Sequence, residues 1–263
     1  MTSWEIRGKR VLITGGNTGI GFATAQALLA RGAVLYLTAR DMDKGSKARA
    51  RLKAQFPGSE VQCLPLDLAS FRSIRALASE LTERTDDLHV LIHNAGLALS
   101  ERRETEEGFE MTFGVNHLGP FLLTQLLWST LLESTPARII HVASDAHRRG
   151  GDLDFDDLQF TRRRYSGIQA YCRSKLANIL TTVELARRLQ GHAITANALH
   201  PGVVATRFAQ DGDVSGPMDW LIKLARPFFI SPARGAETIV HLSTSPALAE
   251  VSGHYFAKCR PSA

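Results

Sequence analysis

The sequence predicts an α/β protein whose core is a doubly wound parallel sheet of about seven strands, with helices on both faces. Strand and helix patterns alternate along almost the whole chain, which is typical of strands that pair in parallel through helical crossovers. Several strands are nearly continuous apolar runs, such as Val-Leu-Ile and Val-Leu-Ile-His, and such runs indicate a sheet that is covered on both faces.

Each element follows from the pattern of its own residues. Short runs of β-branched and apolar residues predict strands, and apolar residues at helical spacing predict helices. Ser70 is a residue type that caps helix N-termini, and a break in one long helix is expected near Gly119 and Pro120. In chain order the predicted elements are strand 9–14, helix 19–31, strand 33–39, helix 41–56, strand 61–65, helix 70–84, strand 88–93, helix 107–132, strand 137–143, helix 169–190 and strand 193–199.

No linker rich in proline, glycine or serine divides this series, so residues 1–263 are expected to form one domain. The segment 202–231 is less regular, because Gly212, Gly216, Pro217 and Pro227 interrupt short helical pieces that contain aromatic residues. Such a segment is a candidate lid over a bound ligand.

The composition excludes several classes of protein. A chain of 263 residues that is 44% apolar and 22% charged can bury a large core, which excludes a disordered tail or a disulfide-rich miniprotein. Cys63, Cys172 and Cys259 are odd in number and widely spaced, so neither a disulfide framework nor a metal site is predicted. This cysteine usage favours a reducing compartment, and we expect a cytoplasmic protein.

Membranes and nucleic acids are not predicted partners on these grounds. No stretch reaches the roughly 20 mostly apolar residues of a transmembrane helix, and residues 1–10 lack the apolar centre of a secretory signal, so a soluble protein is expected. The net charge of +5 is scattered. Its one dense run, Arg162 to Arg164, has no interleaved aromatic residues to stack bases and predicts a solvated loop.

A glycine-rich turn joins the first strand to the first helix. Glycine at these positions permits a tight turn and lets the backbone approach a pyrophosphate, whose charge meets the positive end of the helix. The turn is therefore a candidate dinucleotide-binding site, and an ordinary strand-to-helix turn is the alternative. The candidate contacts are Gly15, Asn17, Thr18, Gly19, Ile20 and Gly21.

Tyr171 and Lys175 lie one turn apart on a predicted helix, so their side chains project from the same face. A phenol with a pKa near 10 transfers protons poorly at neutral pH, and we expect the neighbouring ammonium to lower that pKa. The pair is a candidate for general acid–base catalysis. The alternative is an exposed helix face that carries both residues.

Two further polar residues are candidates for the same site. Ser144 follows an apolar strand, at the end of a parallel sheet where ligands bind, and its hydroxyl can hydrogen-bond a substrate carbonyl oxygen. A turn capped by Ser144 with Asp145 as its partner is the alternative. Asn116 is a poor helix former within a predicted helix, which indicates a functional demand or a mild kink before Gly119.

The order of these motifs resembles the short-chain dehydrogenase/reductase family, from residue 9 to about residue 256. Thr14 to Gly21 is similar to the family's TGxxxGIG cofactor turn, and Tyr171 to Lys175 to its YxxxK motif. The resemblance implies a Rossmann-type fold, hydride transfer between a nicotinamide cofactor and a carbonyl or alcohol, and a water held by Asn116 that relays protons to Lys175. The implied catalytic residues are Asn116, Ser144, Tyr171 and Lys175. The implied cofactor contacts, besides the glycine turn, Tyr171 and Lys175, are Asp67, Leu68, Asn94, Ala95, Gly96, Pro201, Gly202 and Thr206.

The sequence departs from the family pattern at two places. His93 precedes the Asn-Ala-Gly motif, where asparagine is commoner. The segment between Ser144 and Tyr171 is much longer than in a compact member, so residues 148–167 are expected to form an insertion. An insertion of this kind resembles the retinol-dehydrogenase-like branch of the family. The role of Ser144 then requires the insertion to fold away from the site.

The residues after the second strand predict the type of nicotinamide cofactor. Enzymes of this fold bind the adenosine ribose there, and an acidic side chain would accept hydrogen bonds from a free 2′-hydroxyl. Ala39 offers no such group, whereas Arg40 presents a planar charged fork suited to a 2′-phosphate, and Lys44 adds charge. We interpret Asp41 as the N-cap of the next helix. NADP(H) is therefore the predicted cofactor.

The substrate and partners are less narrowly specified. The resemblance and the apolar segment 220–230 favour a lipophilic, retinoid-like aldehyde, ketone or alcohol, although those apolar residues can equally belong to the core or to a subunit contact. A reductase of small polar ketones and a non-catalytic NADP-binding regulator are the alternatives. Helices 107–132 and 169–190 leave a homodimer open, and the lid leaves a peripheral membrane contact open.

Overall fold

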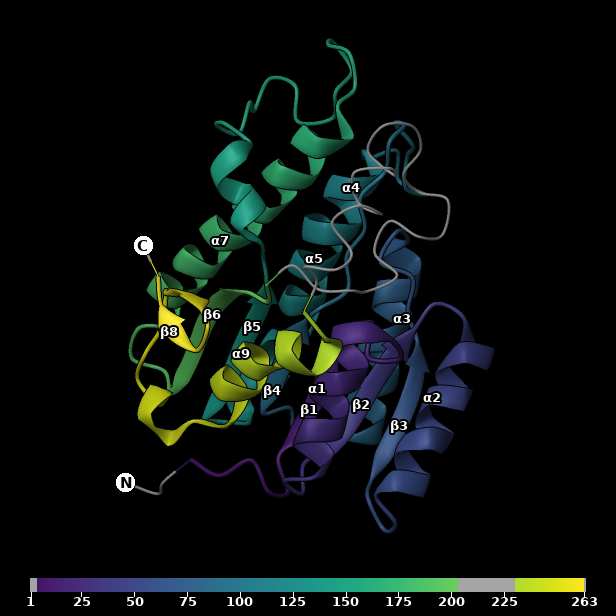
Figure 1. The fold of residues 1–263 in the computed structure, drawn as a ribbon, viewed down its shortest axis with the longest axis vertical. Helices are drawn as coiled ribbons and strands as arrows, with labels where there is room; N and C mark the ends of the chain where they lie inside the picture. The colour runs from purple at the N-terminus through teal and green to yellow at the C-terminus, as the bar shows by residue number, and fades with distance from the viewer. Residues whose placement is uncertain (1–3, 203–229, 263) are drawn as a thin grey trace.

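The computed structural model describes residues 4–202 and 230–262, which form one sheet with helices on both faces (Figure 1). Within them the sheet has eight strands in the order β3-β2-β1-β4-β5-β6-β7-β8. All neighbouring strands pair in parallel except β7 and β8, which are antiparallel. The strands are β1 Arg10–Ile13, β2 Val34–Ala39, β3 Val61–Pro65, β4 Val90–His93, β5 Ala137–Val142, β6 Ile194–His200, β7 Tyr255–Ala257 and β8 Arg260–Pro261.

The helices of the described residues alternate with the first six strands, as the sequence predicts. A helix able to cross a bilayer is absent from this part of the chain. The α-helices are α1 Gly19–Leu29, α2 Met42–Gln55, α3 Phe71–Arg84, α4 Met111–Phe113, α5 Gly119–Leu126, α6 Trp128–Glu133, α7 Gly167–Arg188 and α9 Pro232–Thr244. Three shorter turns are the π-helix η1 Gly114–Leu118 and the 3-10 helices η2 Asp145–Arg149 and η4 Pro246–Leu248.

The core has two layers, one on each face of the sheet. Alternate residues of β1 show this division: Val11 and Ile13 pack with α1, α2 and α9, whereas Leu12 packs with α3, α5, α6 and α7. Helices α1 and α9 lie side by side over the first of these faces (Figure 1). Because side chains alternate across a strand, an apolar strand buried on both sides needs both helical layers. The prediction of a doubly wound sheet is confirmed.

The region predicted as one helix, 107–132, differs most from its prediction. It begins only at Met111, because residues 104–110 form a turn and the Glu110 carboxylate accepts hydrogen bonds from the first amides of α4. The irregularity predicted near Pro120 is the wide turn η1, which immediately precedes α5. Gly119 donates its N–H to the carbonyl of Gly114, one residue further back than in an α-helix. A second interruption separates α5 from α6 at Leu127.

Candidate active site

The glycine-rich turn lies between β1 and α1 and is hydrogen-bonded to the end of β4. The hydroxyl of Thr14 accepts the N–H groups of Asn94 and Ala95 at 2.9 and 3.1 Å. The side-chain amide of Asn94 donates in turn to the carbonyl oxygens of Thr14 and Gly15 at 2.9 and 3.3 Å. Two motifs that are far apart in sequence therefore form one rigid floor at the carboxyl ends of neighbouring strands.

Only glycine fits at the closest approach within this turn. A Cβ on Gly21 would lie 2.4 Å from the carbonyl oxygen of Gly15 and 2.6 Å from the side-chain nitrogen of Asn94. Gly15 itself has φ +63°, which L side chains rarely adopt. The turn therefore leaves backbone N–H groups and the start of α1 accessible to an anion, a fit that the pyrophosphate of a dinucleotide requires.

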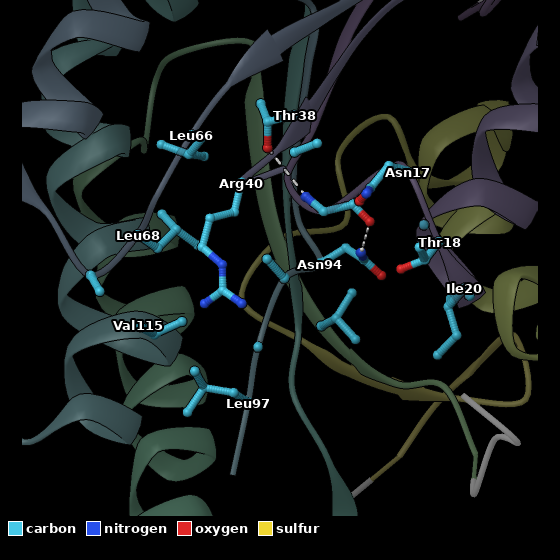
Figure 2. Close-up of a pocket in the computed structure, with 18 of the residues that line it drawn as sticks. Asn17, Thr18, Ile20, Thr38, Arg40, Leu66, Leu68, Asn94, Leu97 and Val115 are labelled. Carbon is cyan, nitrogen blue, oxygen red and sulfur yellow. Dashed lines mark hydrogen bonds between the residues drawn. The ribbon is translucent and has the colours of Figure 1, made fainter. Parts of the chain in front are cut away.

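A cavity of about 630 Å³ runs over this floor along the ends of the strands (Figure 2). Every predicted cofactor contact in the described residues lines it, whereas Thr206 and most of the predicted lid, 202–231, lie outside the described residues. The structure adds side chains that the motifs did not indicate, from Thr38, Leu66, Leu97 and Val115. The predicted contacts along the cavity are Gly15, Asn17, Thr18, Gly19, Ile20, Gly21, Arg40, Asp67, Leu68, Asn94, Ala95, Gly96, Tyr171, Lys175, Pro201 and Gly202.

Arg40 supplies a positive charge to the cavity beside the end of β2. Arg40 leaves β2 and extends into the cavity toward Leu68 and Val115 (Figure 2). The carboxylate of Asp41 instead turns to α2, where it accepts hydrogen bonds from the N–H groups of Asp43 and Lys44 at 3.0 and 3.1 Å. These bonds, led by that of Lys44, lower the pKa of Asp41. Asp41 is thus the helix cap that the sequence predicts.

Three predicted catalytic side chains meet between the end of β5 and the first turns of α7. Tyr171 and Lys175 lie on α7, with the Lys175 Nζ 5.5 Å from the centre of the Tyr171 ring. The Tyr171 hydroxyl is hydrogen-bonded to Ser144, which follows β5. Lys175 is almost fully buried and donates to the carbonyl oxygen of Val142 at 2.9 Å. The Ser144 hydroxyl also accepts the N–H of Ala146 at 3.2 Å, so it caps the turn and faces the tyrosine at once.

Burial dominates the proton affinities of this group. It raises the pKa of Tyr171 to about 12, and the hydrogen bond from Ser144 only partly opposes this change. Burial also lowers the pKa of Lys175 to about 8. The expectation that the pKa of Tyr171 lies below its usual value is therefore wrong for this structure, since the loss of solvation outweighs the hydrogen bond from Ser144.

Asn116 lies in the wide turn η1, which the sequence indicated only as a kink. Its side chain accepts the N–H of Leu97 at 2.8 Å and donates to the Leu97 carbonyl at 2.8 Å and to Ser174 Oγ at 3.0 Å. A Cβ on Gly96 would lie 3.1 Å from the Asn116 oxygen and 3.4 Å from the Lys175 nitrogen. Asn116 thus fastens the segment after β4 to α7 beside Lys175.

The insertion after Ser144 packs against α7 and leaves the Ser144–Tyr171 contact intact. Its centre is Asp157, which accepts hydrogen bonds from Thr161 and from the guanidinium of Arg163. Within the basic run, Arg163 also pairs with Asp154, so this residue does not match the prediction of a solvated loop. Arg162 and Arg164 are exposed, as that prediction requires.

The unusual residue before the Asn-Ala-Gly motif is a core residue. His93 is buried, stacks on His141 with ring centres 4.7 Å apart, and bonds Thr124 Oγ1 at 2.8 Å. Burial lowers the pKa of His93 to about 3, so the ring is neutral at physiological pH. The histidine that stands here in place of the commoner asparagine therefore adds no charge beneath the site.

Comparisons with known proteins agree with this geometry. Residues 9–154 match the model of the short chain dehydrogenase family. Retinol dehydrogenase 12 of Mus musculus is 45% identical over 98% of this chain and 80% of its own length. Retinol dehydrogenase 13 of Homo sapiens is 44% identical over 95% of this chain and 76% of its own. The Pseudomonas aeruginosa RhlG/NADP active-site complex superposes with a TM-score of 0.76 at 28% identity, covering 97% of both chains.

The match to the family model covers more than half of the chain, and the similarity to the relatives covers nearly all of it. The glycine-rich turn, the Asn-Ala-Gly motif and the Tyr171–Lys175 pair, by which the sequence resembles the family, line the cavity. The chain belongs to the short chain dehydrogenase family and is a nicotinamide-dependent oxidoreductase that acts on CH–OH and C=O groups.

Proposed function

We propose that this protein transfers a hydride reversibly between NADP(H) and a lipophilic, retinoid-like aldehyde, ketone or alcohol. The observation that carries the proposal is the contact of Ser144 and Lys175 with Tyr171, in a cavity that Tyr171 and Lys175 line together with Arg40. The names of the similar retinol dehydrogenases support the substrate class. The bound RhlG structure supports the cofactor class.

Each side chain then has a distinct part in carbonyl reduction. Bound NADPH supplies the hydride. Ser144 donates a hydrogen bond to the carbonyl oxygen and orients it, and Tyr171 donates its proton to that oxygen. Lys175 holds the cofactor ribose with N–H groups other than the one bound to Val142. Asn116 keeps the Lys175 side of the site in place through its bonds to Leu97 and Ser174.

The proton affinity of Tyr171 gives the two reaction directions different pH dependences. With a pKa raised to about 12, Tyr171 keeps its proton at neutral pH and is ready to act as the acid. In alcohol oxidation the same group must first be deprotonated. We expect kcat/KM for oxidation to rise up to about 10-fold per pH unit between about pH 7 and 9, while reduction stays nearly constant. Steady-state profiles in both directions measure this, and a reduction rate that climbs with pH contradicts it.

The substrate class is tested by a panel of carbonyl compounds. We expect kcat/KM for retinal or a long-chain aldehyde to exceed that for a small polar ketone by at least about 100-fold, because each buried methylene contributes about 0.8 kcal/mol. A preference for the small ketone favours the alternative reductase. Failure to turn over any carbonyl, with NADPH binding retained, favours the non-catalytic regulator.

A peripheral membrane contact of the lid and a homodimer both stay predictions. The predicted lid lies mostly outside the described residues, but Gly202 lines the cavity and a Cβ on it would lie 2.6 Å from Ile230 Cδ1. A homodimer through α5 and α7 is supported by three large apolar side chains that are about half exposed. These are Phe121, Leu180 and Val183.

A further inference from the structure

The turn that carries Ser144 is not buried in the core. Ser144 precedes η2, a turn of five residues none of which is buried. A polar turn of this kind keeps a single conformation only if hydrogen bonds from neighbouring elements restrain it. The contacts of its first and third residues show where those restraints come from.

Asp145, directly after Ser144, binds two strands at once. Its Oδ1 accepts the hydroxyl of Tyr255, at the start of β7, at 2.7 Å. Its Oδ2 lies 3.3 Å from Nε2 of His200, the last residue of β6. The carboxylate therefore ties the Ser144 turn to the strand that leads into Pro201 and Gly202, both of which line the cavity.

The ring of His200 is held in one protonation pattern by these contacts. Its Nδ1 lies 3.4 Å from the backbone N–H of Asp145 and accepts from it, so the ring proton belongs on Nε2, which donates to the carboxylate. Burial lowers the pKa of His200, and the charge of Asp145 only partly opposes this. The neutral ring of His200 thus accepts the backbone N–H of Asp145 and donates to the carboxylate of the same residue.

His147 adds a third restraint from the other side of the turn. Its Nδ1 lies 2.7 Å from the carbonyl oxygen of Ser144, and because a carbonyl can only accept, Nδ1 carries the proton. The same ring packs edge-on against Tyr255, with ring centres 4.9 Å apart and planes at 70°. Tyr255 therefore supports the turn twice, through Asp145 and through His147.

We propose that Asp145, His147, His200 and Tyr255 form a clamp that positions the Ser144 hydroxyl against Tyr171 and the substrate oxygen. The clamp rests on the proposed function, and its members are positioning residues, because their contacts reach the backbone of the turn and the Asp145 carboxylate, not the reacting atoms. A misplacement of about 1 Å at a catalytic group can cost about 100-fold in rate. A turn with no buried residue is where such a loss is expected.

The test compares substitutions of the clamp with a matched acidic residue of the same loop. We expect Asp145→Ala to lower kcat by about 10- to 100-fold, while KM and the NADPH dissociation constant change by less than about 3-fold. Tyr255→Phe has a smaller effect in the same direction. The double variant is no slower than Asp145→Ala alone, since both remove the same restraint. Asp152→Ala, an exposed acidic residue of the insertion, is the control and stays at the wild-type rate.

Asparagine at the same position separates geometry from loss of folding. Asp145→Asn keeps an oxygen for Tyr255 but sets an amide opposite the Nε2–H of His200, so its kcat should lie between wild type and Asp145→Ala. The primary isotope effect with deuterated NADPH should rise in Asp145→Ala, because hydride transfer becomes rate-limiting. An unchanged kcat and isotope effect overturn the clamp, and so does a loss of cofactor affinity that parallels the loss of turnover.

Hydrogen exchange of residues 143–149 provides a readout without turnover. The amide of Ala146 donates to Ser144 Oγ, so loosening of the turn exposes it. Exchange should accelerate in Asp145→Ala and Tyr255→Phe and remain at the wild-type rate in Asp152→Ala. Absence of carbonyl turnover by the wild type would count against the proposed function, whereas equal protection in all variants would count against the clamp.

Discussion

Replacing Tyr171 with phenylalanine is expected to lower kcat for aldehyde reduction by at least about 10³-fold, since general acid catalysis contributes about 10²- to 10⁴-fold. The variant keeps the ring against Lys175 and removes only the hydroxyl that bonds Ser144. NADPH affinity should change by less than about 3-fold, because the phenol proton is used only in the chemical step. Single-turnover rates and NADPH fluorescence titrations measure the two quantities.

Tyr165→Phe is the matched control for this experiment. Tyr165 is also partly buried and its hydroxyl is also hydrogen-bonded, as a donor to Glu110 at 2.9 Å, but it does not line the cavity. Its loss should cost stability, of about 1 kcal/mol, and leave turnover of the folded protein near the wild-type value. Residual activity above about a tenth of wild type in Tyr171→Phe contradicts the assignment of Tyr171 as the proton donor.

Replacing Arg40 with alanine is expected to weaken NADPH binding by about 10- to 100-fold and NADH binding by less than about 3-fold. The guanidinium extends into the cavity from the end of β2, where Ala39 supplies no acidic group to bind a ribose hydroxyl (Figure 2). The neighbouring Asp41 is held by α2, so it does not neutralise Arg40 through a direct bond. Isothermal titration with both cofactors measures the difference.

Arg75→Ala, on the exposed face of α3, serves as the control for a general change of net charge. It removes one positive charge without altering the cavity lining, so both cofactors should bind it as they bind the wild type. Equal losses for NADPH and NADH in Arg40→Ala would mean that the guanidinium contacts a part common to both, such as the adenine or the pyrophosphate.

The sequence predicted the sheet and the cavity floor well because their residues follow strong local rules. The strands β1 and β4 are short and largely apolar, and their carboxyl ends bring the glycine turn and Asn94 together in a parallel sheet. Asp41 and Ser70 cap α2 and α3, as their residue types predict. These features need no knowledge of distant contacts.

The missed features depend on tertiary structure. The wide turn η1 has no local signature beyond Gly119, where a Cβ would lie 2.8 Å from the carbonyl oxygen of Leu68. The shift in the pKa of Tyr171 has the opposite direction to the one that the sequence predicts. The spacing shows that Lys175 is near, but it does not show how deeply both side chains are buried. The contacts of Asp145 with β6 and β7 link residues that no sequence spacing relates.

The buried amine of Lys175 has a consequence for how this enzyme tolerates engineering. Burial lowers the pKa of Lys175 to about 8, against about 10.5 for the unfolded chain. The free energy of unfolding therefore rises with pH between these two values, and the full destabilisation by the buried ammonium is present below pH 8. That cost is about 3 kcal/mol at neutral pH. A selection for heat resistance alone would therefore enrich apolar residues at position 175, which would stabilise the fold and abolish the enzymatic activity.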